Sequence, residues 1–181
     1  FQSATQNACR LVHAEGDGLP GLIADLYNGG LVVQCHTPGM HRALPTLVEA
    51  FKEALGDTLV GIYDKSAKTL LKNGGEACLD GWAWGSAPEG HFATEHGHRF
   101  DIDWEKGQKT GFFLDQRENR ALLGSLSKGK KVLNVFSYTG GFSIYAMKAG
   151  ATEVHSLDSS QRALDVCEHN VRLNELPLQS H

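Results

Sequence analysis

Short apolar runs separated by turn residues dominate the beginning of the chain. Two such runs, Cys9 to Glu15 and Gly21 to Tyr27, are joined by residues 16–20, and Asn28-Gly29-Gly30 leads into a third run at residues 31–36. Asn-Gly between apolar runs favours a hairpin, because both residues tolerate positive φ. The pattern therefore predicts a three-stranded meander.

A helical periodicity replaces this pattern between His41 and Leu55, where apolar residues recur at helical spacing and Gly56 supplies a stop. Residues 58–63 have the composition of a strand, and residues 64–76 are compatible with either a helical turn or an irregular loop. This order of elements predicts a small α/β module.

Trp82 and Trp84 are spaced two residues apart, which places them on one face of a predicted strand. Stacking with an RNA base and packing as an aromatic pair are both compatible with this spacing, and packing is favoured. Residues 91–95 and 99–103 then predict a hairpin.

The segment from Leu114 to Leu126 has the pattern of an amphipathic helix. Its inward positions are predicted to be Leu114, Ala121, Leu122 and Leu126. A later helix, capped by Ser159 or Ser160, is expected to end before Pro177.

A strand-turn-helix-strand pattern lies between these two helices. The apolar run at residues 132–136 ends near Gly140-Gly141, a helix follows, and a second apolar run ends in Asp158. Glycine lets a ligand approach the backbone closely, and an acid at the second strand end can accept hydrogen bonds from ribose hydroxyls. The pattern predicts a pocket for an adenosine-bearing cofactor, although doubly wound proteins without a ligand can share it.

The identity of the cofactor follows from what the turn lacks. Ile144 occupies the position of the third glycine in Gly-x-Gly-x-x-Gly, which argues against a pyrophosphate cofactor such as NAD or FAD. S-adenosyl-L-methionine has no pyrophosphate and fits better. A nucleotide-dependent oxidoreductase and a non-catalytic RNA-binding or dimerisation module remain as alternatives.

The predicted cofactor contacts come from the glycine turn, the end of the second strand and the start of the preceding helix. A guanidinium there can bind the methionine carboxylate, although Arg117 and Arg120 are equally compatible with solvated helix positions. The set is Gln116, Arg117, Phe136, Ser137, Tyr138, Thr139, Gly140, Gly141, Asp158 and Ser159.

Three blocks of sequence, residues 15–22, 106–120 and 134–143, occur in the order typical of one family. The chain resembles bacterial and archaeal 23S rRNA methyltransferases typified by the large-subunit cytosine-C5 methyltransferase I. The resemblance implies a cytoplasmic class I methyltransferase that uses S-adenosyl-L-methionine and acts on ribosomal RNA. It further implies an α/β fold, with a small α+β central domain at residues 1–90 and the first part of a Rossmann-like domain at residues 91–181.

The family also has parts that this sequence does not match. Members carry an N-terminal RNA-binding PUA domain, an Asp-Pro-Pro type motif and, in cytosine-C5 enzymes, a catalytic cysteine further along. The resemblance therefore implies a fragment with an incomplete active site and no catalytic residue of its own. Binding to 23S rRNA would occur through the intact parent protein. A homodimer is compatible with the resemblance.

Composition adds further constraints. The 17 basic and 21 acidic residues give a net charge of −4, which does not favour RNA binding by this part alone. His91, His96 and His98 could form a metal site or could be surface imidazoles. The second interpretation is favoured, and no metal is predicted. No leader or apolar run of about 18 residues is present, so no membrane association is expected.

The cysteines show no metal-ligand spacing. The four residues are expected to be free thiols in the core rather than nucleophiles, in a reducing cytosol. They are Cys9, Cys35, Cys78 and Cys167.

Overall fold

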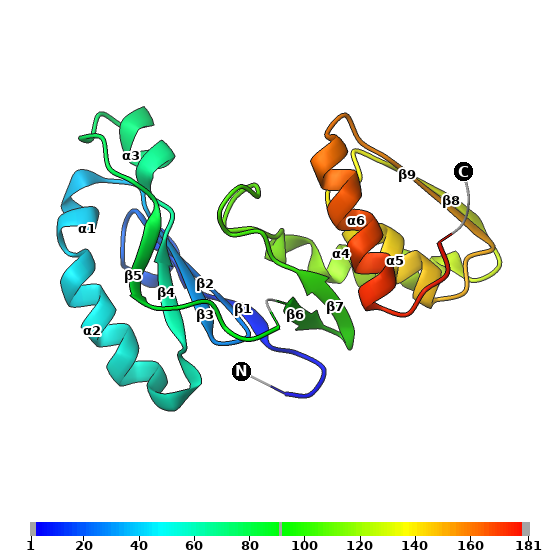
Figure 1. The fold of residues 1–181 in the computed structure, drawn as a ribbon, viewed down its shortest axis with the longest axis horizontal. Helices are drawn as coiled ribbons and strands as arrows, with labels where there is room; N and C mark the ends of the chain where they lie inside the picture. Colours follow the sequence, from blue (N-terminus) through cyan, green and yellow to red (C-terminus); the bar gives the residue numbers. More distant parts are fainter. Residues whose placement is uncertain (1–2, 91, 179–181) are drawn as a thin grey trace. The chain divides into compact units, whose positions relative to one another are not determined.

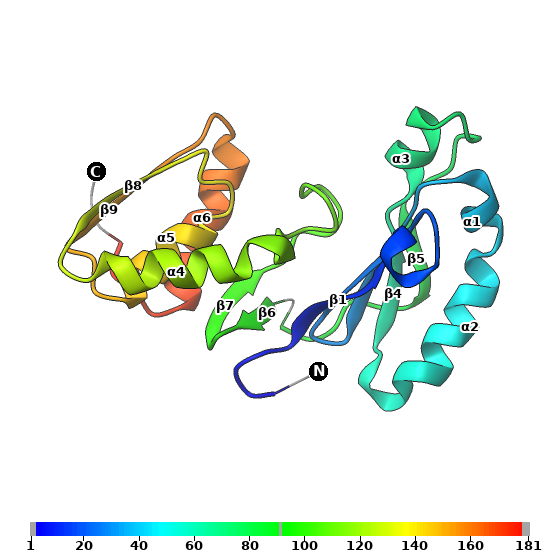
Figure 2. The same cartoon turned by 180° about the vertical axis from the view of Figure 1, so that it is seen from behind.

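The computed structural model describes residues 3–90 and 92–178, which fold into two compact units (Figures 1 and 2). Unit 1 contains residues 1–93 and 102–114, and unit 2 contains residues 94–101 and 115–181. The mixed α/β fold class is confirmed, whereas the domain division at residue 90 stays a prediction. His91, part of the predicted hairpin and of the weighed metal site, lies outside the described residues.

Unit 1 is built on a five-stranded sheet in the order β1-β2-β3-β4-β5. Strands β3 and β4 are parallel, and the other neighbours are antiparallel. The first three strands confirm the predicted meander. The strands are β1 (Ala8–His13), β2 (Leu22–Tyr27), β3 (Gly30–Cys35), β4 (Gly61–Asp64) and β5 (Gly81–Gly85).

The helices of unit 1 connect its strands. The helix predicted between His41 and Leu55 is two helices, α1 (Pro38–Arg42) and α2 (Leu44–Leu55), and a proline lies in the first turn of each. Proline lacks a backbone N–H and is therefore tolerated where a helix begins. A 3₁₀ turn, η2 (Gly56–Thr58), precedes β4, and α3 (Ala67–Lys72) shows that the segment after β4 is helical.

One face of this sheet forms an apolar core. The alternate residues of β2 and β3 on that face pack against Leu44 and Val48 of α2. Because side chains alternate across a strand, the intervening residues of β2 point to the opposite face. The core residues of the two strands are Leu22, Ala24, Leu26, Leu31, Val33 and Cys35.

The segment of residues 102–114 contributes polar contacts to residues of β2. Thr110 donates to Asp25 Oδ2 at 2.6 Å, and Tyr27 lies 2.8 Å from the same threonine hydroxyl. Arg10 completes the cluster with two bonds to the Asp25 carboxylate, at 2.8 and 2.9 Å. Asp25 and Thr110 are fully buried, so this loop is an integral part of unit 1.

The prediction that Trp82 and Trp84 share a strand face is wrong. The register between β4 and β5 shifts, so that Trp84 pairs with Ile62 and Trp82 pairs with the next residue, Tyr63. Trp84 packs against the apolar core, whereas Trp82 makes edge-to-face contacts with Tyr63 and Trp104 at 5.3 and 5.8 Å. An irregularity of this kind changes which side chains share a face. Both indoles are packed, but the favoured interpretation of an aromatic pair is wrong, because Trp82 packs with Tyr63 and Trp104 and not with Trp84.

Unit 2 begins with a hairpin and continues as the predicted strand-turn-helix-strand unit. Strands β8 and β9 are parallel, from Lys131 opposite Glu153 to Val135 opposite Leu157. The elements are β6 (Phe92–Glu95, whose first two residues belong to unit 1), β7 (His98–Asp101), α4 (Arg117–Ser127), β8 (Lys131–Val135), α5 (Gly141–Lys148), β9 (Glu153–Leu157) and α6 (Gln161–Leu173). A 3₁₀ turn, η3 (Leu114–Gln116), precedes α4.

The predicted inward face of α4 is partly wrong. Leu122 and Leu126 are 60% and 66% exposed, and the helix buries Arg120, Gly124 and Ser127 instead. A Cβ at Gly124 would lie 3.4 Å from the Tyr145 carbonyl of α5, an ordinary van der Waals distance, so this position of α4 lies directly against α5. The periodicity of apolar residues therefore indicated the wrong stripe, because this helix packs through a glycine and a buried arginine.

Among the described residues, no helix has the combination of length and apolar character that crossing a membrane requires.

Candidate cofactor site

The turn between β8 and α5 has an unusual backbone. Phe136, Tyr138 and Gly140 have positive φ values of 60°, 49° and 78°. Side-chain-bearing residues rarely adopt this conformation, which costs about 1–3 kcal/mol each and is concentrated at functional sites. The turn is therefore held by its surroundings.

Hydrogen bonds from three directions hold this turn. Ser137 N donates to the carbonyl of Leu157 at the end of β9 at 3.0 Å, and Gly140 N closes the turn on the Ser137 carbonyl at 2.9 Å. Asn170 of α6 donates from Nδ2 to the Thr139 carbonyl at 2.9 Å. The turn is thus fixed before any ligand arrives.

Asp158 lies directly beside this turn. Its Oδ2 accepts a hydrogen bond from Tyr138 N at 2.8 Å, and its Oδ1 accepts one from Ser160 N at 2.9 Å. Each carboxylate oxygen can accept more than one bond, so the partly exposed group keeps capacity for hydroxyl donors. The structure brings together the glycine turn and the carboxylate, as the sequence predicted.

The two glycines have a packing role of their own. A Cβ on Gly140 would lie 2.2 Å from Cys167 Sγ, and one on Gly141 would lie 3.1 Å from Arg120 Cδ. These positions are therefore restricted by α6 and α4. Close approach of a ligand to the backbone, the reason inferred from the sequence, stays a prediction.

Ser137 provides a polar group that the described residues leave unpaired. Its side chain is only 5% exposed, and its Oγ has no hydrogen-bond partner there. A buried hydroxyl without a partner costs about 1–3 kcal/mol. The Asp158 acceptor and the highly exposed ring of Phe136 are compatible with the adenosyl part of a cofactor.

The remaining predicted contacts, Gln116, Arg117 and Ser159, lie outside the turn. Gln116 donates to Asp115 at 3.1 Å and accepts from Asn119 at 2.9 Å, and Arg117 Nε donates to Glu95 at 3.2 Å. Ser159 is exposed, and Ser160 is the residue that caps α6. Cofactor contact by these three residues stays a prediction.

Sequence reasoning missed Asn170, which is completely buried. Besides contacting the turn, it accepts a bond from Asp101 N of β7 at 2.8 Å. Its position beside Val171 in the apolar stripe of α6 was the available signal, because a buried amide must find hydrogen-bond partners.

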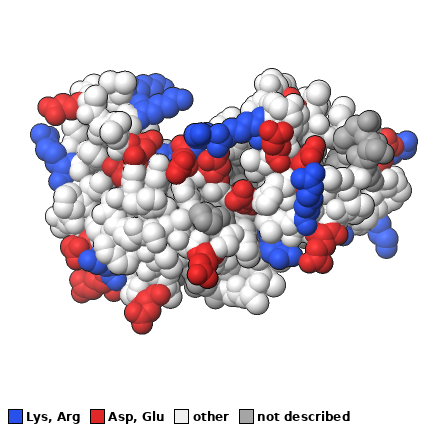
Figure 3. Space-filling model, viewed as in Figure 1, with Lys and Arg blue, Asp and Glu red and all other residues white. Residues whose placement is uncertain are grey.

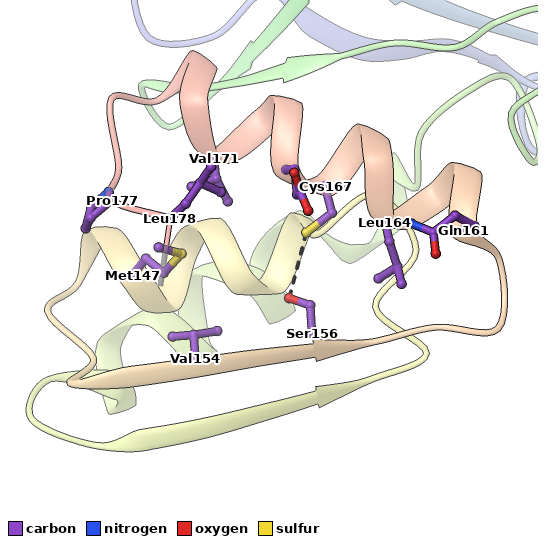
Figure 4. A pocket seen from close by; sticks show the side chains of 10 residues that line it. Met147, Val154, Ser156, Gln161, Leu164, Cys167, Val171, Pro177 and Leu178 are labelled. Carbon is purple, nitrogen blue, oxygen red and sulfur yellow. Dashed lines mark hydrogen bonds between the residues drawn. The ribbon is translucent and has the colours of Figure 1, made fainter. Parts of the chain in front are cut away.

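Unit 2 also has a cavity of about 500 Å³ between α5, β9 and α6 (Figure 4). Its lining is mainly apolar and includes none of the predicted cofactor contacts. It is therefore a feature distinct from the glycine turn. The lining residues are Met147, Val154, Ser156, Gln161, Leu164, Cys167, Glu168, Val171, Pro177 and Leu178.

Two of the four cysteines, Cys35 and Cys167, are buried as predicted, whereas Cys9 and Cys78 are only partly buried. Burial raises the pKa of Cys35 to about 11, and it also raises the pKa of Cys78 and of Cys167. Cys167 donates to Ser156 Oγ at 3.7 Å. A raised pKa keeps these three thiols protonated near neutral pH, which makes them poor nucleophiles.

The potential metal ligands of the described residues make local contacts and do not form a cluster. In the described parts of the chain, no group of three or more His, Cys, Asp or Glu residues could hold a metal ion. His96 Nδ1 lies 3.1 Å from the Tyr145 hydroxyl, and burial lowers the pKa of His98. Figure 3 shows acidic and basic side chains interspersed on the face that it draws.

A parallel strand pair with a constrained turn after its first strand and a carboxylate after its second defines a nucleotide-binding type of fold. The chain belongs to the S-adenosylmethionine-dependent methyltransferase family, whose sequence profile matches residues 10–180. This match confirms the resemblance seen in the sequence and the cofactor class inferred from it.

Two curated relatives carry the name "Ribosomal RNA large subunit methyltransferase I". The protein of Tolumonas auensis is 40% identical over 174 residues, which are 95% of this chain and 43% of the relative. The protein of Shewanella amazonensis is 42% identical over 168 residues, or 92% of this chain and 42% of the relative. The chain thus spans less than half the length of these relatives.

Solved structures agree with this assignment. A proposed SAM-dependent methyltransferase from Streptococcus mutans has a TM-score of 0.85 and 28% identity, covering 99% of this chain and 46% of its own. A proposed methyltransferase complexed with SAH also has a TM-score of 0.85 and 28% identity, with 99% and 45% coverage.

Proposed function

We propose that this chain carries part of the S-adenosyl-L-methionine site of an enzyme that methylates large-subunit ribosomal RNA. The 2.8 Å hydrogen bond between Tyr138 N and Asp158 carries the proposal, because it joins the two features that the cofactor would bridge. The names of the relatives support the substrate class. The finer assignment, 23S rRNA and cytosine C5, rests on the sequence resemblance.

The proposed roles divide between the two ends of the cofactor. Asp158 accepts from the ribose hydroxyls, the turn and Ser159 line the adenosine, and Arg117 with Gln116 binds the methionine carboxylate. When bound, the cofactor supplies an activated methyl group; this chain binds and orients it. The turn residues are Phe136, Ser137, Tyr138, Thr139, Gly140 and Gly141.

The proposal assigns no nucleophile to the four cysteines. Methylation at cytosine C5 requires a thiolate that adds to C6, and burial disfavours the thiolate of Cys35 and Cys167. Replacing each cysteine by serine is expected to leave methyl transfer largely intact. Near-complete loss of transfer in one such variant, with folding retained, would contradict this assignment.

The cofactor assignment is tested by calorimetry on the protein at its natural length. S-adenosylhomocysteine should bind, and Asp158→Ala should weaken binding at least tenfold, corresponding to about 1.4 kcal/mol. Asp165→Ala is the matched control, because Asp165 is an exposed acid on α6. Binding of NADH in place of S-adenosylhomocysteine would favour the oxidoreductase alternative.

The substrate assignment is tested by transfer of a labelled methyl group to isolated ribosomal RNAs. Label is expected in 23S rRNA and, after digestion and mass spectrometry, in 5-methylcytosine. Action on ribosomal RNA would place the protein in the cytoplasm. RNA binding or self-association without methyl transfer would instead support the non-catalytic alternative, and the homodimer stays a prediction for sedimentation analysis.

A further inference from the structure

A buried glutamate organises the side chains around the start of α4 in unit 2. Glu95, the last residue of β6, is 0% exposed. Its Oε1 and Oε2 accept from Arg120 Nε and Nη2, both at 2.8 Å, in a bidentate pair. Oε2 also accepts from Arg117 Nε at 3.2 Å, and Oε1 accepts from the Tyr145 hydroxyl at 3.0 Å. One carboxylate therefore meets donors from both α4 and α5.

This cluster contacts the candidate cofactor site in two ways. The Arg120 side chain lies against Gly141, where α5 begins, and its Cδ would be 3.1 Å from a Cβ at that position. Arg117 is the residue proposed to bind the methionine carboxylate. The orientation of this guanidinium and the space beside the first turn of α5 are thus both linked to Glu95.

The energetics favour a role in geometry over a role in stability. The free energy lost when two charges leave water is about as large as the free energy gained when they pair in the interior. Replacing both members of a buried ion pair by apolar side chains is therefore often neutral or stabilising. A bidentate carboxylate-guanidinium pair does, however, fix the plane and direction of the arginine. Burial raises the pKa of Tyr145, with a further contribution from Glu95, so the tyrosine remains a donor.

We propose that Glu95 is a positioning residue for cofactor binding. It holds Arg120 against the first turn of α5 and holds Arg117 in the orientation that receives the methionine carboxylate. The inference rests on the proposed function, because it assigns a purpose to residues beside that same site.

The decisive experiment separates stability from positioning in the protein at its natural length. The double variant Glu95→Leu/Arg120→Met replaces the buried pair by apolar side chains. It is expected to melt within a few degrees of the wild type while binding S-adenosylhomocysteine at least tenfold more weakly. Binding within twofold of the wild type in the folded double variant would overturn the positioning role.

A milder variant decides the matter if the double variant does not fold. Tyr145→Phe removes one donor from Glu95 without changing the ring, and about threefold weaker binding is expected with folding retained. Unchanged affinity would overturn the inference. Glu153→Gln is the matched control, because this partly exposed glutamate pairs with Lys131 on the surface, and its affinity should stay unchanged.

The two proposals fail in different ways. If the wild-type protein does not bind S-adenosylhomocysteine, the proposed function is wrong. If the wild type binds and the variants bind equally tightly, the proposed function stands and only the role of Glu95 is rejected.

Discussion

The sheets of the two units differ in how their faces are covered. In unit 1, β2, β3 and β4 consist almost entirely of buried residues, with an apolar core on one face and polar contacts from residues 102–114 on Asp25 and Tyr27. In unit 2, exposed and half-buried residues alternate along β8, and Val154 is the one buried residue of β9. Leu133 and Leu157 are 66% and 57% exposed. The two sheets are therefore stabilised in different ways.

This difference distinguishes unit 1, which is a packed scaffold, from unit 2, which contains the candidate cofactor site. Unit 1 is held by burial of apolar area, which contributes about 25 cal/mol per Å² removed from water. The candidate site in unit 2 is held by directed contacts, such as those of Asp158 and Asn170 with the glycine turn. Directed contacts determine geometry more strictly than apolar packing does, as a cofactor site requires.

The largest effect is expected in the core of unit 1. Leu31 is completely buried, so Leu31→Ala should lower the free energy of unfolding by about 3 kcal/mol through lost burial and a residual cavity. Tryptophan fluorescence during urea unfolding measures this unit specifically, because Trp82, Trp84 and Trp104 all belong to it. A loss below about 1 kcal/mol would show that the core is loosely packed.

A comparable effect is expected at the turn of unit 2. Gly140→Ala places a Cβ 2.2 Å from Cys167 Sγ at a φ of 78°, and should cost about 2–3 kcal/mol. Hydrogen exchange of the α5 amides measures this loss. Gly129→Ala is the control: its φ is 69° but no atom lies within 4 Å, so only about 1 kcal/mol of backbone strain is expected. Equal losses at both positions would refute the packing role of Gly140.

A smaller effect is expected where residues 102–114 meet β2. Thr110→Val keeps the shape of the side chain but removes its bonds to Asp25 and Tyr27, which should cost about 1–2 kcal/mol. Trp104 lies in the same segment and should report the change by fluorescence. If stability and fluorescence are both unchanged, the polar cluster does not hold this loop.

The smallest effect is expected on the open face of unit 2. Leu133→Ala in this 181-residue chain should change stability by less than about 0.5 kcal/mol, because the side chain is 66% exposed. Hydrogen exchange of β8 measures the change. A cost like that of Leu31→Ala would mean that this face is covered in solution, and the contrast between the sheets would disappear.

The sequence predicted features that short stretches of chain determine. The meander around Asn28 and the turn at Gly140 were predicted because glycines and alternating apolar runs act locally. The faces of Trp82 and Trp84 were not, because the register shift depends on the pairing with β4. Leu122 was wrongly placed inward because the sequence does not reveal that Arg120 is buried instead. Arg120 finds its partner, Glu95, only when the hairpin folds beside α4.

The site was predicted to the same limited extent. Gly140 and Asp158 were placed together because strand ends in a parallel pair meet at one edge of the sheet. Glu95 and Asn170 were missed, since their importance depends on partners far along the chain. Buried polar residues of this kind become recognisable only when their hydrogen-bond partners are known.

The central claim is that the glycine turn and Asp158 together receive an adenosyl compound. Hydrogen-deuterium exchange with and without S-adenosylhomocysteine, on the protein at its natural length, tests it most directly. Exchange at residues 137–141 and 158–160 is expected to be slower when the ligand is bound. Binding that leaves exchange at both segments unchanged would contradict the account.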